Sequence, residues 1–281
     1  MPSLEDKLNV ALLSRETRRI RRRLPPPTTP SDDSSLGLID FNSNDYLSLS
    51  RSRNLRNLFL SKLHIAPDIL GSGGSRLLVN GKAHAALESR LASFFRSPAA
   101  LLFNSGFDAN VGLFSCVPQP GDFIVYDEHI HASVHDGIRA SRTALTARCP
   151  FHHNSLSSLR DVLSTLRDKH VGLRSGADNA FVGVESLYSM DGTFAPLLQI
   201  ADTLSEFFPL GNGYLIVDEA HATGIYGPQG RGLVSMLGLE DRVLARLHTF
   251  GKALAATGGM WFAVCTIFVV IDTYLYTALK L

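Results

Sequence analysis

The chain has 281 residues, of which 45% are hydrophobic and 19% charged, a composition typical of a globular protein with a sizeable core. At about 100–200 residues per domain, this length allows one large domain, or one domain and part of a second. The formal net charge of +1 gives no long-range attraction toward nucleic acid or an anionic membrane, so neither is expected as a partner. The three cysteines are far apart and lack CxxC spacing, which argues against a zinc ribbon or a disulfide framework and favours a reducing compartment.

Residues 1–35 are expected to form an N-terminal helix followed by a linker. An arginine-rich, solvated amphipathic helix is predicted from about Leu4 to Arg23, and it should end before Pro25–Pro27, because proline lacks the N–H that continues a helix. The arginines would also suit a mitochondrial presequence. Such a presequence is poor in acidic residues, however, and this segment contains several. The solvated helix is therefore the preferred interpretation.

Residues 36–259 alternate short apolar runs with stretches of helical periodicity. The apolar runs predict buried strands at Ala99–Phe103, Phe123–Tyr126, Ala180–Glu185 and Tyr214–Val217. Two stretches, His84–Phe95 and Ser155–Lys169, place leucines on one face, as amphipathic helices do. This alternation predicts an α/β fold with a mostly parallel sheet covered by helices on both sides. Ligands of such folds bind at the carboxyl ends of the strands, where the polar residues of this chain accumulate.

The sequence DEAH at Asp218–His221 follows a predicted strand, and a nucleotide-driven helicase presents its magnesium ligands in this way. A helicase also needs the phosphate-binding loop GxxxxGK[ST]. Gly81-Lys82 and Gly251-Lys252 are both followed by alanine and lack the earlier glycine. The segment GSGGSR at Gly71–Arg76 lacks the last glycine of the dinucleotide-binding fingerprint. Nucleotide binding is therefore not expected.

Histidine and carboxylate clusters also raise the question of a metal site. His129 and His131 lie in DEHIHAS, and Asp218 and His221 lie in DEAH. The two histidines of the first pair would point to opposite faces of an extended segment, so they would not converge on one ion. No metal site is expected from these residues.

Lys252 lies 34 residues after Asp218 in the sequence. Lys252 comes after an apolar segment that ends in Thr249, and it lies among small residues. Partial desolvation there would depress the pKa of the amine and make it nucleophilic. A buried Asp218 would in turn need a cationic partner. A protonated pyridine nitrogen is such a partner, and an enzyme that uses pyridoxal phosphate also needs a reactive lysine.

Several short motifs occur along the chain in a fixed order: SNDYL, GSGGSR, NSGFDAN, DEHIHAS, ESLYSMDG, VDEAHATG and TFGK. In this order they resemble the α-oxoamine synthase family of pyridoxal-phosphate enzymes. SNDYL and GSGGSR are most similar to the branch of that family that serves biotin synthesis. The resemblance implies the fold type I of pyridoxal-phosphate transferases for residues 36–259, with pyridoxal 5′-phosphate as cofactor and a homodimer as the assembly of intact members.

The resemblance also implies roles for individual residues. Lys252 would attach the cofactor covalently, Asp218 would pair with its pyridine nitrogen, and His131 would stack on its ring, which makes these three the expected catalytic residues. Ser189 and His221 would contact the ring hydroxyl.

The remaining expected roles concern the phosphate and the substrate. Gly106 and Phe107 would open a helix and give main-chain N–H groups to the cofactor phosphate, as helix N-termini do for anions. Thr249 would add a hydroxyl to the same group, and Asn44 would lie near the substrate.

The reaction implied by the resemblance is a decarboxylating condensation of an amino acid with an acyl-CoA, catalysed by a C-acyltransferase. L-alanine and pimeloyl-CoA are the favoured substrates, and the sister enzymes of the family would use glycine or serine. The cytoplasm is the expected compartment, with the mitochondrion and the peroxisome as alternatives.

The resemblance is expected to end at Gly259, so that residues 260–281 form a divergent hydrophobic tail and the C-terminal small domain is missing. That domain would carry the arginine that binds the substrate carboxylate, so the chain as it stands is expected to be inactive. The tail could be a foreign segment of a truncated, spliced or faulty gene product, or a sheet strand. It could also be a membrane anchor, because Met260–Leu279 is long enough to span a bilayer. Two function classes therefore remain, an acyl-CoA-dependent synthase and an inactive cofactor-binding fragment that pairs with a full-length relative.

Overall fold

The computed structural model describes residues 3–23, 40–67, 69, 73–74, 76, 78–79, 81–264 and 266–271. The chain divides into two compact units, Met1–Asn42 and Ser43–Leu281.

The first unit contains helix α1 (Leu4–Thr17). The helix begins with a capping box, in which Oγ of Ser3 accepts from the N–H of Asp6 at 3.1 Å and the N–H of Ser3 donates to the Asp6 carboxylate at 2.8 Å. The helix ends at Thr17, earlier than the predicted Arg23, and none of its residues is buried. The helix, its start at Leu4 and its solvated character therefore agree with the prediction, whereas its C-terminal end does not, and no buried apolar face distinguishes one side of α1.

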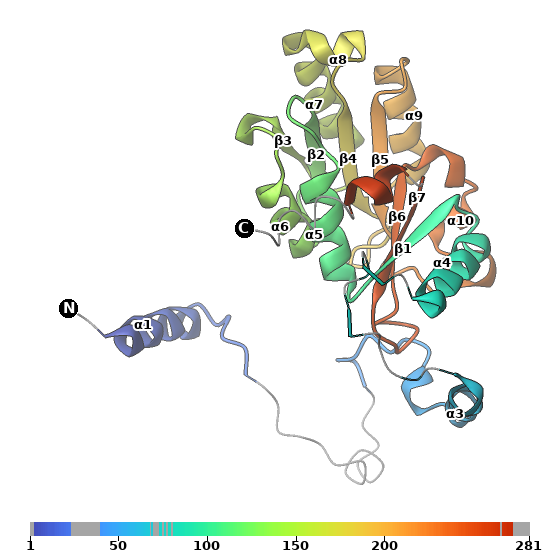
Figure 1. Cartoon of the computed structure of the whole chain (residues 1–281). Helices are drawn as coiled ribbons and strands as arrows, with labels where there is room; N and C mark the ends of the chain where they lie inside the picture. Colours follow the sequence, from blue (N-terminus) through green and yellow to red (C-terminus); the bar gives the residue numbers. More distant parts are fainter. Residues whose placement is uncertain are drawn as a thin grey trace. The chain divides into compact units, whose positions relative to one another are not determined.

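The second unit is built on a seven-stranded sheet with the strand order β1-β7-β6-β5-β4-β2-β3 (Figure 1). Strand β7 runs antiparallel to both its neighbours, and every other pairing is parallel. The predicted α/β class and the four predicted strands are confirmed. β3 and β6 were not predicted as strands, and for β7 a strand was one of the interpretations left open. The strands are β1 (Ala99–Phe103), β2 (Phe123–Asp127), β3 (Arg148–Phe151), β4 (Ala180–Glu185), β5 (Gly213–Asp218), β6 (Ala245–Thr249) and β7 (Gly259–Ala263).

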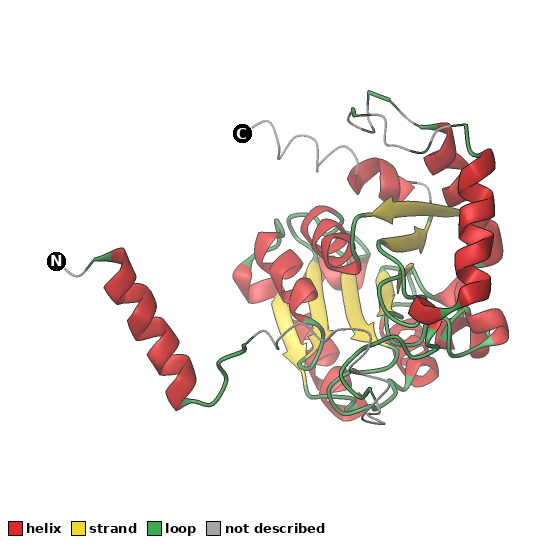
Figure 2. Cartoon of the chain, turned by 90° about the horizontal axis from the view of Figure 1, so that it is seen from below, coloured by secondary structure: helices red, strands yellow, loops and turns green. Residues whose placement is uncertain are grey.

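Helices cover both faces of the sheet (Figure 2). Both predicted helices are present as α4 and α7, and α7 buries Leu159, Leu163 and Leu166 on the predicted face. The α-helices of this unit are α3 (Arg53–Ile65), α4 (Lys82–Phe94), α5 (Gly106–Cys116), α6 (Ala132–Ala140), α7 (Leu156–Lys169), α8 (Val171–Ser175), α9 (Leu197–Phe207) and α10 (Leu233–Met236). The 3₁₀ turns are η1 (Leu49–Arg51), η2 (Leu145–Ala147), η3 (Pro228–Gly230) and η4 (Glu240–Arg242).

The two faces of the sheet belong to separate core layers. Val182 and Val217 pack in the layer formed with α7 and α9, whereas Phe181 and Ile216 pack in the layer formed with α5 and α6. Neighbouring residues of a strand point to opposite faces, so a strand buried on both sides reads as a continuous apolar run. This explains why the central strands could be recognised without an alternating pattern.

The residues after Gly259 do not begin a separate tail. Met260–Ala263 form most of β7, which lies between β1 and β6, and every residue of this strand is buried. Trp261 is fully buried and donates a hydrogen bond of 2.7 Å from Nε1 to the carbonyl of Ala109 in α5. The expected boundary at Gly259 therefore lies inside a strand of the sheet. Of the interpretations left open for the C-terminal segment, a sheet strand is the one that residues 260–263 form.

The chain continues beyond β7 as a short helix. Residues 266–271 are helical, and Ile267, Phe268 and Ile271 pack in the layer that contains Trp261. Cys265 and residues 272–281, which include the last eight residues of the predicted anchor Met260–Leu279, lie outside the described residues. Within the described part of the chain, none of the helices combines the length and the apolar character that crossing a bilayer requires.

Candidate active site

Two buried carboxylates mark the carboxyl end of the sheet. Glu185 is the last residue of β4 and Asp218 the last of β5, and they are neighbours in the register of these parallel strands. Oδ2 of Asp218 accepts a hydrogen bond of 2.8 Å from the side-chain amide of Asn110 in α5. Oδ1 of Asp218 accepts one of 2.9 Å from the main-chain N–H of Ala220. Both oxygens of Asp218 are thus oriented by neutral donors.

Lys252 lies in the turn after β6, close enough to both carboxylates to interact with them electrostatically. Burial lowers the pKa of the Lys252 ammonium, and the charge of Asp218, together with that of Glu185 once it ionises, opposes this shift. A larger fraction of the amine is therefore neutral at a given pH than in an exposed lysine. Because the neutral amine is the nucleophile, the site favours the reactive form of Lys252.

Glu185 is a residue of this site that the sequence analysis missed. It is only 4% exposed, and burial raises its pKa to about 8, with the charge of Asp218 adding to the shift and that of Lys252 opposing it. The carboxyl group therefore keeps its proton at neutral pH beside the ionisable pair. Its position in the sequence could have identified it, because Glu185 ends a predicted strand and begins the ESLYSMDG motif.

His131 and His221 lie at the same end of the sheet and are both neutral at pH 7. Burial lowers the pKa of His131, and Lys252 adds to the effect while Asp218 opposes it. Burial and then the charge of Lys252 lower the pKa of His221 to about 4. His131 caps α6, with Nδ1 2.7 Å from the Ser133 hydroxyl, and its ring meets that of Phe107 edge-on, with the centroids 6.2 Å apart.

The first turn of α5 meets the end of β6. Ser105 caps this helix by accepting a hydrogen bond of 3.0 Å from the N–H of Asp108. Helix geometry leaves the first N–H groups, which include those of Gly106 and Phe107, without carbonyl partners inside the helix. A Cβ added to Gly106 would lie 3.2 Å from Cβ of Thr249 and 3.3 Å from its hydroxyl oxygen. The glycine therefore lets the helix N-terminus lie directly against the side chain of Thr249.

Asn44 is connected to the site by a hydrogen bond with Tyr46, a residue to which the sequence analysis gave no role. The hydroxyl of Tyr46 lies 2.9 Å from Nδ1 of His221 and 3.0 Å from Oδ1 of Asn44. Ser189, in contrast, is exposed in the turn after β4 and takes no part in the hydrogen bonds described above. The structure thus brings Asp218, Lys252 and both histidines together, connects Asn44 to them through Tyr46, and leaves Ser189 at the rim.

Comparison with known proteins gives consistent results for sequence and structure. A family model described as aminotransferase class I and II matches residues 37–276, a range that extends past Gly259. The chain is 50% identical over 260 residues to 8-amino-7-oxononanoate synthase of Emericella nidulans, which covers 92% of this chain and 61% of that protein. It is 46% identical over 224 residues to aminoacyl transferase sphA of Aspergillus fumigatus, which covers 79% of this chain and 47% of that protein.

Solved structures of similar proteins include two named enzymes. Serine palmitoyltransferase of Sphingomonas wittichii matches with a TM-score of 0.70 and 28% identity, covering 82% of this chain and 54% of that one. 8-Amino-7-oxononanoate synthase of Francisella tularensis matches with a TM-score of 0.65 and 28% identity, covering 85% and 62%. The chain therefore spans about half to three fifths of the length of the relatives that it matches.

Proposed function

The chain belongs to the family of class I and II aminotransferases. From this premise we propose that it binds pyridoxal 5′-phosphate and uses it to catalyse an α-oxoamine synthase reaction. The observation that carries the proposal is the buried Asp218 electrostatically coupled to Lys252 at the carboxyl end of the sheet. The similarity to 8-amino-7-oxononanoate synthases and serine palmitoyltransferase supports the same reaction class. The proposed activity is that of a C-acyltransferase, which joins an amino acid to an acyl group with loss of carbon dioxide.

The polar groups of the site fit the cofactor at each of its ends. Asp218 receives hydrogen bonds from neutral donors, so a protonated pyridine nitrogen would supply the cation that a buried carboxylate favours. Lys252 would hold the cofactor covalently, and the neutral ring of His131 would cover one face of it. The N-terminus of α5 at Gly106 and Phe107, together with the Thr249 hydroxyl, would bind the phosphate.

The outer residues would complete the contacts. His221 and Ser189 would contact the ring hydroxyl, and Asn44 would lie beside the substrate. His221 is held by Tyr46, which also bonds Asn44, so a single hydroxyl connects the residue proposed for the ring to the residue proposed for the substrate.

When bound, pyridoxal phosphate supplies an electron sink that stabilises negative charge on the Cα atom of an amino acid. Asp218 keeps the sink effective, because its negative charge favours the protonated ring nitrogen. Lys252 is the base proposed to remove the Cα proton, since its lowered pKa leaves more of the amine free to accept one. The neutral histidines add no positive charge that would compete with the ring nitrogen for Asp218.

L-alanine and pimeloyl-CoA are the proposed substrates, which would place the reaction in biotin synthesis. Glycine and serine remain the alternatives, and the fold similarity to serine palmitoyltransferase makes serine the first of them to test. A homodimer is the proposed assembly. The cytoplasm is the proposed compartment, supported by cysteines without disulfide spacing.

Cofactor binding is tested by mixing the purified chain with pyridoxal phosphate and following visible absorption. Borohydride reduction followed by peptide mapping is expected to place the cofactor on Lys252. The variant Lys252→Ala should lose the label, whereas Lys62→Ala and Lys169→Ala, which change exposed lysines, should keep it. Labelling of Lys62 or Lys169 in the unmodified chain would refute the assignment.

The reaction is tested separately by release of the coenzyme A thiol. Pimeloyl-CoA is incubated with the cofactor-loaded chain and with L-alanine, glycine or serine in turn. Thiol release with L-alanine above the other two would support the proposed substrate. Attachment of the cofactor to Lys252 without thiol release from any of the three would overturn the condensation and leave cofactor binding standing.

A further inference from the structure

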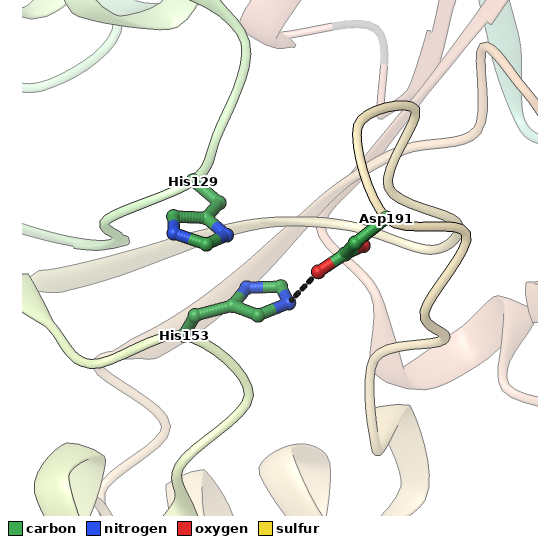
Figure 3. A group of neighbouring side chains, drawn as sticks. All are labelled: His129, His153 and Asp191. Carbon is green, nitrogen blue, oxygen red and sulfur yellow. Dashed lines mark ion pairs between the residues drawn. The ribbon is translucent and has the colours of Figure 1, made fainter.

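Three side chains outside the proposed cofactor contacts converge at the same end of the sheet. His129 follows β2, His153 follows β3, and Asp191 lies in the turn after β4, and these three strands are neighbours. Their nitrogen and oxygen atoms that could bind a metal all lie within 4.8 Å of one another. Figure 3 shows the two imidazole rings one above the other, with the Asp191 carboxylate beside them.

A buried carboxylate behind the cluster orients its central member. Asp127, the last residue of β2, is fully buried, and its Oδ1 lies 2.9 Å from Nδ1 of His153. The same side chain accepts hydrogen bonds of 2.8 Å from the main-chain N–H groups of His129 and Asn154. Asp127 thus fixes the ring of His153 and the backbone of both histidine loops. A histidine that donates one ring N–H to a carboxylate while its other nitrogen faces a ligand position is the usual arrangement around protein-bound metals.

The other nitrogen of His153, Nε2, lies 2.9 Å from the Thr193 hydroxyl and 3.1 Å from the side-chain nitrogen of Asn154, and it also faces another acceptor. With the Nδ1 proton directed at Asp127, the lone pair lies on Nε2, which is 3.1 Å from Oδ2 of Asp191. Two acceptors at this distance repel unless a proton or a cation lies between them. His129 offers a third ligand atom, because a nitrogen of its ring lies within 4.8 Å of those of His153 and Asp191 and the two rings stack with their centroids 4.2 Å apart.

We propose that His129, His153 and Asp191 bind a divalent transition-metal ion of the zinc class. Two imidazoles and one carboxylate form a common zinc ligand set that leaves one position for water. Bonds of about 2.0–2.2 Å place the ligand atoms of a tetrahedral site about 3.4 Å apart. The His153–Asp191 pair already meets this spacing, and His129 is exposed, so rotation of its side chain brings its nitrogen in.

The ion would join the three loops that follow β2, β3 and β4 at this end of the sheet. One of these loops carries Ser189, which lies two residues before Asp191 at the rim of the cofactor site. The site does not depend on the proposed reaction, because none of its three ligands is among the residues assigned to the cofactor. His131, the other histidine of DEHIHAS, interacts with Asp218 and Lys252 instead.

The test uses the full chain without a histidine tag, stripped with EDTA and titrated with Zn²⁺ against a chromogenic chelator. One equivalent is expected to bind, and His129→Ala and Asp191→Asn should each weaken binding at least tenfold. The matched control is His152→Ala, because His152 is an exposed neighbour that pairs with Glu128 and lies outside the cluster. Substitution by Co²⁺ should give a visible spectrum that disappears in His129→Ala.

His153→Ala also removes the partner of Asp127 and can impair folding, so the decision rests on the two exposed ligands. Failure of the unmodified chain to bind one equivalent of Zn²⁺ would overturn the proposal and identify His153 as a histidine that holds only a proton between two aspartates. Equal affinity of His129→Ala, Asp191→Asn and His152→Ala would overturn it as well.

Discussion

The hydroxyl of Tyr46 lies 2.9 Å from Nδ1 of His221, although the two residues are 175 positions apart in the sequence. This hydrogen bond connects the segment that contains Asn44 to the loop that follows β5. Tyr46→Phe removes the hydroxyl and is expected to lower the free energy of unfolding by about 0.5–1.5 kcal/mol, the net value of a single hydrogen bond. Chemical denaturation measures the difference. Tyr226→Phe serves as a control at a partly buried tyrosine, and an equal loss in both variants would show that the contact with His221 has no specific effect.

Asp218→Asn is expected to reduce proton removal from the substrate far more than cofactor attachment. An amide lacks the charge that keeps the ring nitrogen protonated, so exchange of the L-alanine Cα proton with deuterated water should slow by about 10²-fold or more. Borohydride labelling of Lys252 should persist. Glu206→Gln, which changes an exposed ion pair with Arg160, is the control for a lost carboxylate. Exchange at the unmodified rate in Asp218→Asn would rule out the proposed role.

Glu185 gives a specific dependence of stability on pH. Its pKa rises from 4.5 in the unfolded chain to about 8 in the folded one, so between these values the folded state binds more protons than the unfolded state. The contribution of this group is therefore fully present below about pH 4.5 and is lost as the pH rises toward 8. Glu185→Gln cannot lose a proton, so its stability relative to the unmodified chain should increase with pH from 5 to 8. Denaturation at several pH values measures this trend, and a relative stability independent of pH would contradict it.

Cofactor attachment should also depend on pH in one direction. The neutral amine of Lys252 is the nucleophile, so the attachment rate is expected to rise with pH through the lowered pKa of this group. The rate should level off at a lower pH than for free lysine, because burial already favours the neutral form. Stopped-flow absorption at a series of pH values gives the profile. A midpoint at the ordinary pKa of lysine would show that burial does not tune this amine.

Trp261 is the only tryptophan of the chain and reports directly on β7. Because its side chain is fully buried, the native emission should be blue-shifted and resistant to iodide, and unfolding should move it to the red. Trp261→Ala is expected to cost about 3–5 kcal/mol of stability. Red-shifted emission that iodide quenches in the native protein would place residues 260–263 outside the sheet.

The sequence predicted the structure best where a strand or a residue pair is determined by the burial of residues close together in the chain. Continuous apolar runs identified the central strands, because a strand covered on both sides needs no alternation. Asp218 and Lys252 could be paired because a buried carboxylate and a buried amine each need a counterpart. Glu185 and Asn110 were missed, since their importance arises from neighbours in space: Asn110 reaches Asp218 across 108 positions. The pairing of residues 259–263 with two distant strands is equally absent from their local sequence.

The position of β7 has a consequence for the order in which the molecule can be assembled during synthesis. Among the described strands, β1 pairs with β7 alone, and β7 follows the other six in the chain. Strands β2 to β6 can pair with one another as they leave the ribosome, whereas β1 must wait until Gly259–Ala263 have emerged. Gly259 also lies against the start of α5, where a Cβ would come within 2.6 Å of the Gly106 nitrogen. The helix end proposed to hold the phosphate is therefore fixed only after β7 has been made, and a nascent chain would gain its affinity for the cofactor only when β7 inserts.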